Sequence, residues 1–287
     1  MFKNKFNIIA FLLPFALLAV LFIFDSCVQE YKNDKNAIIH KYTRNAPRMK
    51  LNNVRNASGL TFCNDTNTVF VVQDSPSKII EINYSGQIIR KIKLNDMNDI
   101  EGITYLGNNR FAIVEESTST IYFVSIKHDT KEISKQDTAP LHLKIPNNNH
   151  EGLSGITYDP ENKALFVITE KNPKSITKIF IGSEKQETPW DLEKTDIKDA
   201  SGIAYDSTTK HLFIVSKTSK NILELTSNGK VLAKLPLTKG YSNLKRTLKK
   251  PEGISIDSKN RRFFICGEKN EFYIFAKNPI QEKNLSK

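Results

Sequence analysis

The stretch 153–170, LSGITYDPENKALFVITE, decides the fold because it recurs along the chain. A short apolar segment, GITYD, is followed by a polar turn, PENK, and then by a second apolar run, ALFVITE. Runs rich in β-branched and aromatic residues on either side of a turn are typical of a β-hairpin. Because these runs are apolar on both faces, we expect both faces of each strand to be covered.

Four further copies of the phrase occur, at residues 57–75, 100–117, 200–218 and 251–269. The copies share one glycine each, spaced by 43 to 53 residues: Gly59, Gly102, Gly155, Gly202 and Gly253. This interval is close to that of a four-stranded propeller blade. The chain is therefore predicted to be all-β and to form a five-bladed β-propeller. Six blades are possible if one has diverged in the long interval after Gly102, and a β-sandwich would not explain the repeat.

The fifth copy has no fourth strand of its own, because the residues after it, NPIQEKNLSK, are polar and rich in turn formers. We expect residues 41–53 to supply the missing outer strand, which would close the ring and remove an exposed sheet edge. The predicted organisation is a signal or anchor segment at 1–27, a tether at 28–48, the propeller at 49–278 and a polar tail at 279–287.

The N-terminus has the pattern of an export signal. Lys3 and Lys5 precede an uncharged apolar run at 8–24, whose length lies between a signal-peptide core and a membrane-spanning helix. The preceding lysines favour a cytoplasmic N-terminus with the rest of the chain on the other side of the membrane. Cys27 loosely resembles a bacterial lipidation site. Lipidation and an uncleaved anchor both leave the domain tethered to a membrane.

Composition excludes several classes of function. The formal charge of +11 is spread over the whole chain, which favours solubility and attraction to anionic lipid or polyanions. No nucleic-acid-binding module or basic stripe is present. Three cysteines are too few for a disulfide framework. The chain has no P-loop, dinucleotide fingerprint or G-x-S-x-G elbow. His150 and Glu151 begin like a zinc motif, but Ser154 stands where the second histidine is required.

Two positions of the repeat collect acidic residues. The residue before each glycine is Ser58, Glu101, Ser154, Ser201 or Glu252, and the residue at the end of the second strand is Asp74, Glu116, Glu170, Lys217 or Glu268. Because the second strand runs back along the first, both sets should lie at one end of the central channel. Crowded carboxylates repel unless they are protonated or bridged by a cation, and calcium prefers oxygen ligands. The alternative is that each carboxylate pairs with a nearby lysine, such as Lys171 or Lys269.

The phrases IEGITYLGNNRFAIVEE, ITEKNP and PEGISID with EKNEFY make residues 50–276 resemble the bacterial SdiA-regulated family, also called the YjiK/CarP family. The resemblance implies a five-bladed propeller similar to NHL-repeat propellers, on the cytoplasmic membrane and facing the periplasm or exterior. It also implies bound calcium and a role in regulation. The matching acidic residues, expected as metal ligands, are Glu101, Glu116, Glu170, Glu252 and Glu268.

Three further residues are expected at the channel mouth: Asp74, Glu151 and Lys217. Copy three has Ser154 where the family tends to have a glutamate, and Glu151 is the candidate to replace that carboxylate. The predicted function is a calcium-binding regulatory or scaffolding module whose protein or small-molecule partner is unknown. The alternative is a calcium-dependent hydrolase of the phytase or lactonase type, in which Lys217 would act beside the metal.

Overall fold

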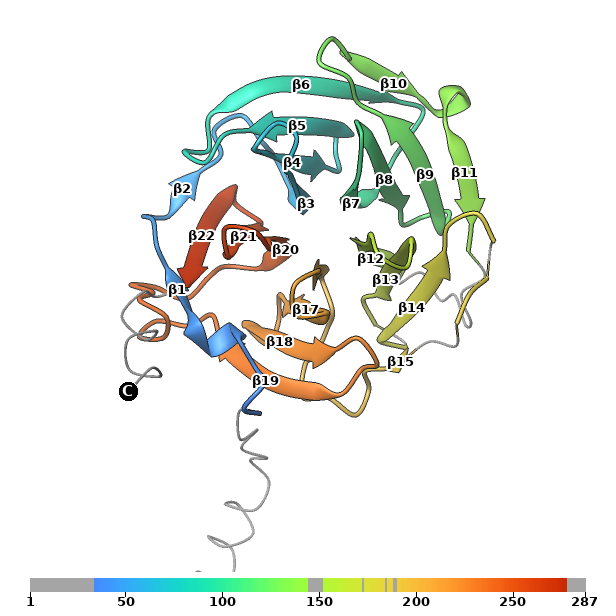
Figure 1. Ribbon diagram of the computed structural model, residues 1–287. Coiled ribbons are helices and arrows are strands. Elements are labelled where there is room, and N and C mark those ends of the chain that lie inside the picture. Colours follow the sequence, from blue (N-terminus) through green and yellow to red (C-terminus); the bar gives the residue numbers. More distant parts are fainter. Residues whose placement is uncertain (1–33, 144–151, 172, 184, 188–189, 278–287) are drawn as a thin grey trace, which may run out of the picture. The chain divides into compact units, whose positions relative to one another are not determined.

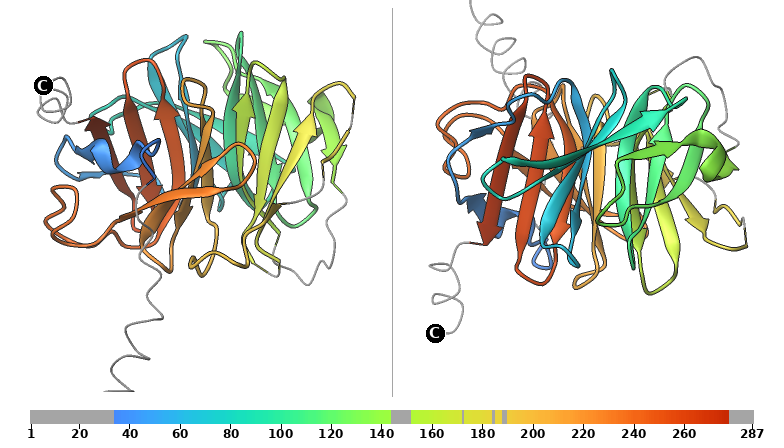
Figure 2. Two further views of the ribbon diagram at one scale, coloured as in Figure 1. Left: turned by 60° about the horizontal axis from the view of Figure 1, so that its bottom comes forward. Right: turned by 90° about the horizontal axis from the view of Figure 1, so that it is seen from above.

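Five β-sheets surround a common axis in the computed structural model, which describes residues 34–143, 152–171, 173–183, 185–187 and 190–277 (Figure 1). The five-bladed propeller predicted from the repeat is confirmed. Each copy of the repeat supplies the two innermost strands of one blade. The loops lie on two opposite faces (Figure 2). We name the face at which the innermost strands begin the mouth face.

The blades are numbered from the first copy of the repeat. Blade 1 contains β3 (Ala57–Cys63), β4 (Thr68–Gln73), β5 (Lys78–Ile82), β6 (Ile88–Asn95) and β10 (Glu132–Ser134). Blade 2 contains β7 (Ile100–Gly107), β8 (Arg110–Glu115), β9 (Thr120–Ser125) and β11 (Ala139–His142). Blade 3 contains β12 (Leu153–Asp159), β13 (Ala164–Thr169), β14 (Ser175–Phe180) and β15 (Trp190–Asp191).

Blade 4 contains β16 (Gly202–Asp206), β17 (His211–Ser216), β18 (Asn221–Thr226) and β19 (Val231–Pro236). Blade 5 contains β20 (Pro251–Asp257), β21 (Arg262–Gly267) and β22 (Glu271–Lys277), together with β1 (Tyr42–Arg44) and β2 (Met49–Lys50) from the N-terminal side. Two short 3₁₀ helices complete the secondary structure, η1 (Ile39–Lys41) and η2 (Lys135–Asp137).

Alternate residues of a strand pack against different neighbouring blades. In β4, Phe70 and Val72 join the cluster shared with blade 2, whereas Val69 and Val71 join the cluster shared with blade 5. One apolar cluster fills each of the five blade interfaces. This arrangement explains why the inner strands are apolar on both faces, since the side chains of a strand alternate between its two sides.

The ring is closed by residues 34–50, which we call the strap. β1 and β2 both pair antiparallel with β22, and they provide the outer strand that the fifth copy lacks. Tyr42 is buried against Phe263 in an edge-to-face contact with ring centroids 4.6 Å apart. The outer strand expected within residues 41–53 is therefore present.

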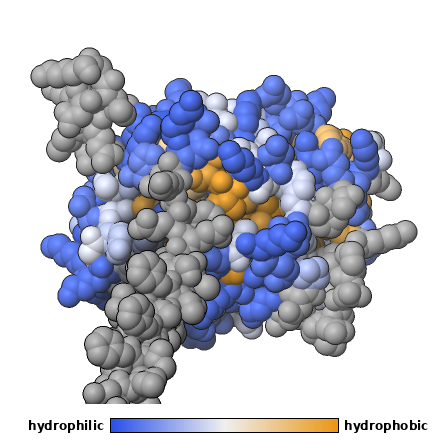
Figure 3. Space-filling model, turned by 90° about the horizontal axis from the view of Figure 1, so that it is seen from below, coloured by the Kyte–Doolittle hydropathy of each residue, from blue (hydrophilic) through white to orange (hydrophobic). Residues whose placement is uncertain are grey.

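The edge of the propeller at the bottom of Figure 1 is mainly hydrophilic, with an apolar area near its middle (Figure 3).

A buried carboxylate fastens the beginning of the strap to blade 4. Glu224 of β18 accepts hydrogen bonds from the backbone N–H groups of Ile38 and Ile39 at 2.8–3.0 Å, and its Oε1 lies 2.7 Å from His211 Nδ1. The side chain of Glu224 has no solvent exposure. Its loss would leave two buried N–H donors without an acceptor.

We expect Glu224→Ala to release the strap and to lower the free energy of unfolding by about 2–4 kcal/mol, since several buried hydrogen bonds to a charged group are lost. The measurement is thermal unfolding combined with limited trypsin cleavage after Lys41 and Arg44. Glu81→Ala is the matched control, because Glu81 pairs with Phe70 as Glu224 pairs with Phe213 but does not contact the strap. Equal cleavage of the strap in both variants would contradict this role of Glu224.

The long interval between Gly102 and Gly155 contains an extra strand and not a sixth blade. β10 leaves blade 2 and pairs in parallel with β6 at the edge of blade 1, and the chain then returns through η2 to form β11. Lys135 of η2 binds Glu115 at 3.0 Å. The extra strand thereby links blades 1 and 2, and its Ile133 joins their shared apolar cluster.

Candidate metal centre at the channel mouth

The five repeat glycines close the central axis. A Cβ atom placed on Gly59 would lie 3.0 Å from the Cα of Gly102, and the same close approach, at 3.0–3.2 Å, continues around the ring back to Gly59. The cavity that remains on the axis is about 10 Å³, near the lower limit for a single water molecule. A ligand of the channel must therefore bind at one of its ends.

A β-bulge lies at the residue before the glycine in four of the five copies. The pairing of β7 with β8 shifts between Ile100 and Gly102, so Glu101 is the extra residue of the bulge. The same shift occurs at three equivalent positions: Ser58, Ser154 and Glu252. Bulges re-aim side chains and are common beside functional sites. This geometry explains how the first acidic position of the repeat comes to line the mouth.

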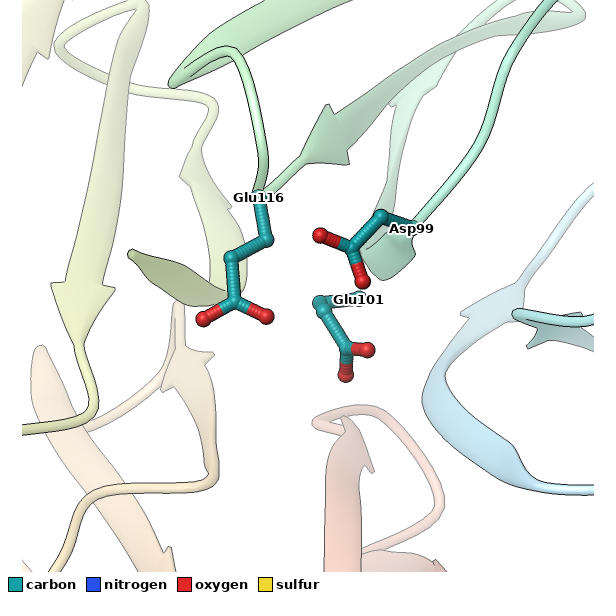
Figure 4. Close-up of side chains that lie close together, drawn as sticks. All are labelled: Asp99, Glu101 and Glu116. Atoms are coloured by element: carbon teal, nitrogen blue, oxygen red, sulfur yellow. The ribbon is translucent and has the colours of Figure 1, made fainter. Parts of the chain in front are cut away.

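Three carboxylates of blade 2 meet at this mouth (Figure 4). Asp99 immediately precedes β7, Glu101 lies in β7, and Glu116 immediately follows β8. One oxygen atom from each residue lies within 4.8 Å of the others. The backbone fixes their spacing, because the Glu116 N–H donates to the Asp99 carbonyl at 2.9 Å. We call Asp99, Glu101 and Glu116 the acidic triad.

Burial and mutual repulsion disfavour the charged forms of the triad. Burial, followed by the charges of Glu116 and Asp99, raises the pKa of Glu101 from 4.5 to about 8. Burial also raises the pKa of Glu116, although the hydrogen bond that Gly152 N donates to Glu116 Oε1 at 2.8 Å opposes this effect. The pKa of Asp99 is raised by burial and by Asp74. Without a metal, Glu101 therefore holds a proton at neutral pH that a cation could displace.

Three further glutamates of the mouth, Glu170, Glu252 and Glu268, have cationic partners, whereas Asp74 forms no ion pair with another described residue. Lys217 Nζ lies 2.8 Å from Glu170 Oε2 and 3.5 Å from Glu252 Oε2, so it bridges blades 3 and 5. Burial opposes the charge on Lys217, but Glu252 and Glu170 together raise its pKa above the usual value. Burial still raises the pKa of Glu252 to about 7.

Two further lysines form ion pairs at the mouth. Lys171 lies 3.2 Å from Glu170, and Lys250 lies 2.6 Å from Glu268. In the described part of the chain, no lysine or arginine forms an ion pair with a member of the acidic triad. The mouth thus contains both arrangements considered from the sequence. Neutralising pairs occupy blades 3 to 5, and an uncompensated cluster occupies blade 2.

The serines of the ring link neighbouring blades. Ser154 Oγ donates to the Ala200 carbonyl at 2.6 Å, and Ser201 Oγ donates to the Pro251 carbonyl at 2.9 Å. Ser154 is buried and engaged with the next blade, so it does not extend the acidic triad. The expected replacement carboxylate, Glu151, lies outside the described residues, as does Cys27.

Asp99 is not among the site residues predicted from the repeat, because it lies two residues before the position that precedes each glycine. At the position of Asp99, the copies carry Asn56, Asp99, Gly152, Asp199 and Lys250. Asp99 has a φ of +58°, a left-handed conformation that aspartate tolerates better than most residues. Four of the five copies have a polar residue at this position, and this pattern is the sequence feature that points to Asp99 as a site residue.

Comparison with known proteins supports the fold. The SdiA-regulated family matches residues 34–276. Among solved structures, the glutaminyl cyclase of Myxococcus xanthus has a TM-score of 0.60 at 13% identity, covering 82% of this chain and 95% of that chain. A streptogramin B lyase has a TM-score of 0.51 at 15% identity, covering 80% and 97%. Both similarities concern the fold alone.

The virginiamycin B lyase of Staphylococcus aureus is similar at 18% identity with a TM-score of 0.47. The match covers 76% of this chain and 65% of the lyase chain. Within the residues that the structure describes, no helix is long and apolar enough to cross a bilayer. The apolar run at 8–24 lies outside those residues.

Proposed function

The protein belongs to the SdiA-regulated family, and from this premise we propose that it is a membrane-tethered propeller that binds calcium at the acidic triad. It faces the periplasm or exterior of a bacterial cell and acts as a regulatory or scaffolding module. The tether is the N-terminal segment with its apolar run at 8–24. The observation that supports the calcium site is that the described residues offer the triad no lysine or arginine ion pair, whereas Glu170, Glu252 and Glu268 of the same mouth are paired with lysines.

The geometry of the triad suits calcium. Calcium–oxygen bonds measure about 2.3–2.6 Å, so two ligand oxygens on opposite sides of one ion lie up to about 5 Å apart. The triad oxygens lie within 4.8 Å of one another, which satisfies this limit. Three carboxylates leave room for waters or carbonyl groups among the six to eight ligands that calcium takes. Asp99, Glu101 and Glu116 would hold the ion, which would neutralise their mutual repulsion.

Calcium at this position would act on the loops of the mouth face. Asp99 belongs to the connection between blades 1 and 2, and Glu116 begins the loop between β8 and β9. Glu116 also accepts a hydrogen bond from Gly152, which lies just before the first strand of blade 3. Metal binding would thus join segments of three neighbouring blades, as expected of a site that controls a binding surface.

The hydrolase alternative would need a cation free to act beside the metal. Lys217, the cation that this alternative requires, is engaged with both Glu170 and Glu252. This pairing favours the binding module over the hydrolase.

We expect Glu116→Gln to weaken calcium binding at least tenfold, because it removes a charged ligand while keeping the shape of the side chain. Isothermal calorimetry at pH 7 measures the change. Glu268→Gln is the matched control, since Glu268 occupies the same repeat position in blade 5 but pairs with Lys250. An equal loss of affinity in both variants would place the ion elsewhere in the mouth.

A further inference from the structure

A second concave site lies at the outer edge of blade 5, between the strap and the loop 237–250 that joins β19 to β20 (Figure 1, the orange loop beside β1). The cavity has a volume of about 220 Å³. Its lining consists of Arg44, Arg48, Leu244, Lys245, Arg246 and Tyr273. Four of these six residues are cationic, and they come from two segments that are far apart in sequence.

The walls of this cavity are held in place by the backbone. The Arg44 N–H donates to the Ser242 carbonyl at 2.9 Å, and Arg44 Nε donates to the Asn243 carbonyl at 3.1 Å. Leu244 and Leu248 are buried and anchor the loop on both sides of the exposed residues 245–247. The strap and the loop are therefore positioned relative to each other before any ligand binds, which lowers the entropic cost of binding.

The cavity has an excess of positive charge. Glu271 is the carboxylate beside it, and it is already engaged by Arg48 Nη1 at 3.0 Å and by the Tyr273 hydroxyl at 3.1 Å. In the described part of the chain, no hydrogen bond or ion pair engages the side chains of Lys245 and Arg246. Subtracting Glu271 from the four cations leaves a net charge of about +3.

The size and chemistry of the cavity define its ligand. Its volume is below the roughly 300 Å³ at which pockets for drug-sized molecules begin, so it suits a headgroup and not a large organic ligand. Arginine guanidinium groups match the geometry of oxyanions and often bind them through two parallel hydrogen bonds. The buried Tyr273 ring and Leu244 add an apolar wall.

We propose that this cavity binds a phosphate-type oxyanion, supplied either by the headgroup of an anionic phospholipid or by a soluble phosphate compound. Arg44, Lys245 and Arg246 contact the anion, and Arg48 supports it while remaining paired with Glu271. This site is separate from the acidic triad and does not require calcium. On a membrane-tethered chain, a lipid headgroup bound here would hold the edge of blade 5 against the bilayer.

The test uses the full-length protein in a non-ionic detergent with EDTA present, so that calcium binding plays no part. One arm titrates inorganic phosphate by calorimetry. The other arm measures binding to vesicles containing phosphatidylglycerol and to vesicles of phosphatidylcholine alone, after the protein has been transferred from detergent into an amphipathic polymer.

The variant for both arms is Lys245→Gln with Arg246→Gln, whose side chains are exposed. We expect binding of phosphate, of phosphatidylglycerol vesicles or of both to weaken at least about tenfold, because two charge-assisted contacts are removed. The control is Arg110→Gln with Lys259→Gln, which removes two exposed cations at the β7–β8 and β20–β21 hairpins, on the face opposite the mouth.

Binding of phosphate alone identifies a soluble ligand, and selective binding of phosphatidylglycerol vesicles identifies a lipid. Either result supports the site if binding weakens in the cavity variant and not in the control. Equal weakening in the cavity variant and the control would show that net charge alone is responsible, and it would overturn the proposal. So would the absence of binding to both probes at millimolar phosphate and excess vesicles.

Discussion

Glu101→Gln is expected to stabilise the calcium-free protein at pH 7 by on the order of 3 kcal/mol. The folded-state pKa of Glu101 is about 8 and its ordinary value is 4.5, so the folded state binds more protons than the unfolded state between these values. Protonated Glu101 makes its full contribution to the free energy of unfolding below about pH 4.5, and this contribution is lost as the pH rises to about 8. Glutamine stays neutral throughout and avoids this loss.

The order of stability should reverse in saturating calcium. The wild type gains stability from binding the ion, whereas the variant has lost one of the charged ligands. Thermal unfolding at pH 5 and pH 7, in EDTA and in calcium, measures both effects, and the difference in EDTA should fall below about 1 kcal/mol at pH 5. Glu161→Gln, at an exposed glutamate in the turn after β12, is the control. A Glu101→Gln variant less stable than the wild type in EDTA at pH 7 would refute the electrostatic account of the triad.

Gly202→Ala is expected to be the most destabilising single-methyl addition in the propeller. An added Cβ would collide with the Glu252 carbonyl, and it would lie 3.1 Å from the Cα of Gly253. Both neighbours are backbone atoms of the adjacent inner strand, so the clash can be relieved only by moving a blade. We expect a loss of at least about 3 kcal/mol, or a melting temperature lowered by roughly 6–12 °C.

Gly107→Ala is the comparison variant for the glycine ring. Gly107 has a φ of +92°, but no atom lies within 4 Å of an added Cβ. Its substitution should cost only backbone strain, about 1–2 kcal/mol. If the two alanine variants melt at the same temperature, the close approach of the inner strands does not limit the stability of the ring.

The architecture was predictable because one phrase, repeated at one interval, encodes both a hairpin and two apolar faces. The glycine of that phrase lies where neighbouring inner strands contact each other. The absence of a fourth strand in the last copy correctly indicated that another segment, the strap, closes the ring. The extra strand β10 was not predictable, since Glu132–Ser134 is short and polar and pairs with an edge that only the folded propeller presents.

The site was predictable only in part. The repeat indicated that the acidic positions share one face, because a hairpin returns to the end where it began. It did not indicate which carboxylates are neutralised, since that depends on where the long side chains of Lys217 and Lys250 reach in three dimensions. Asp99 and the basic cavity also depend on loops, and the cavity forms only when the strap meets the loop 237–250.

Crystals of the protein grown with calcium, and measured at a wavelength where calcium scatters anomalously, test the central claim most directly. The account predicts one anomalous peak per chain at the mouth, 2.3–2.6 Å from oxygen atoms of Asp99, Glu101 and Glu116. An ordered mouth with no peak at millimolar calcium, or a peak bound only by other residues, would contradict it.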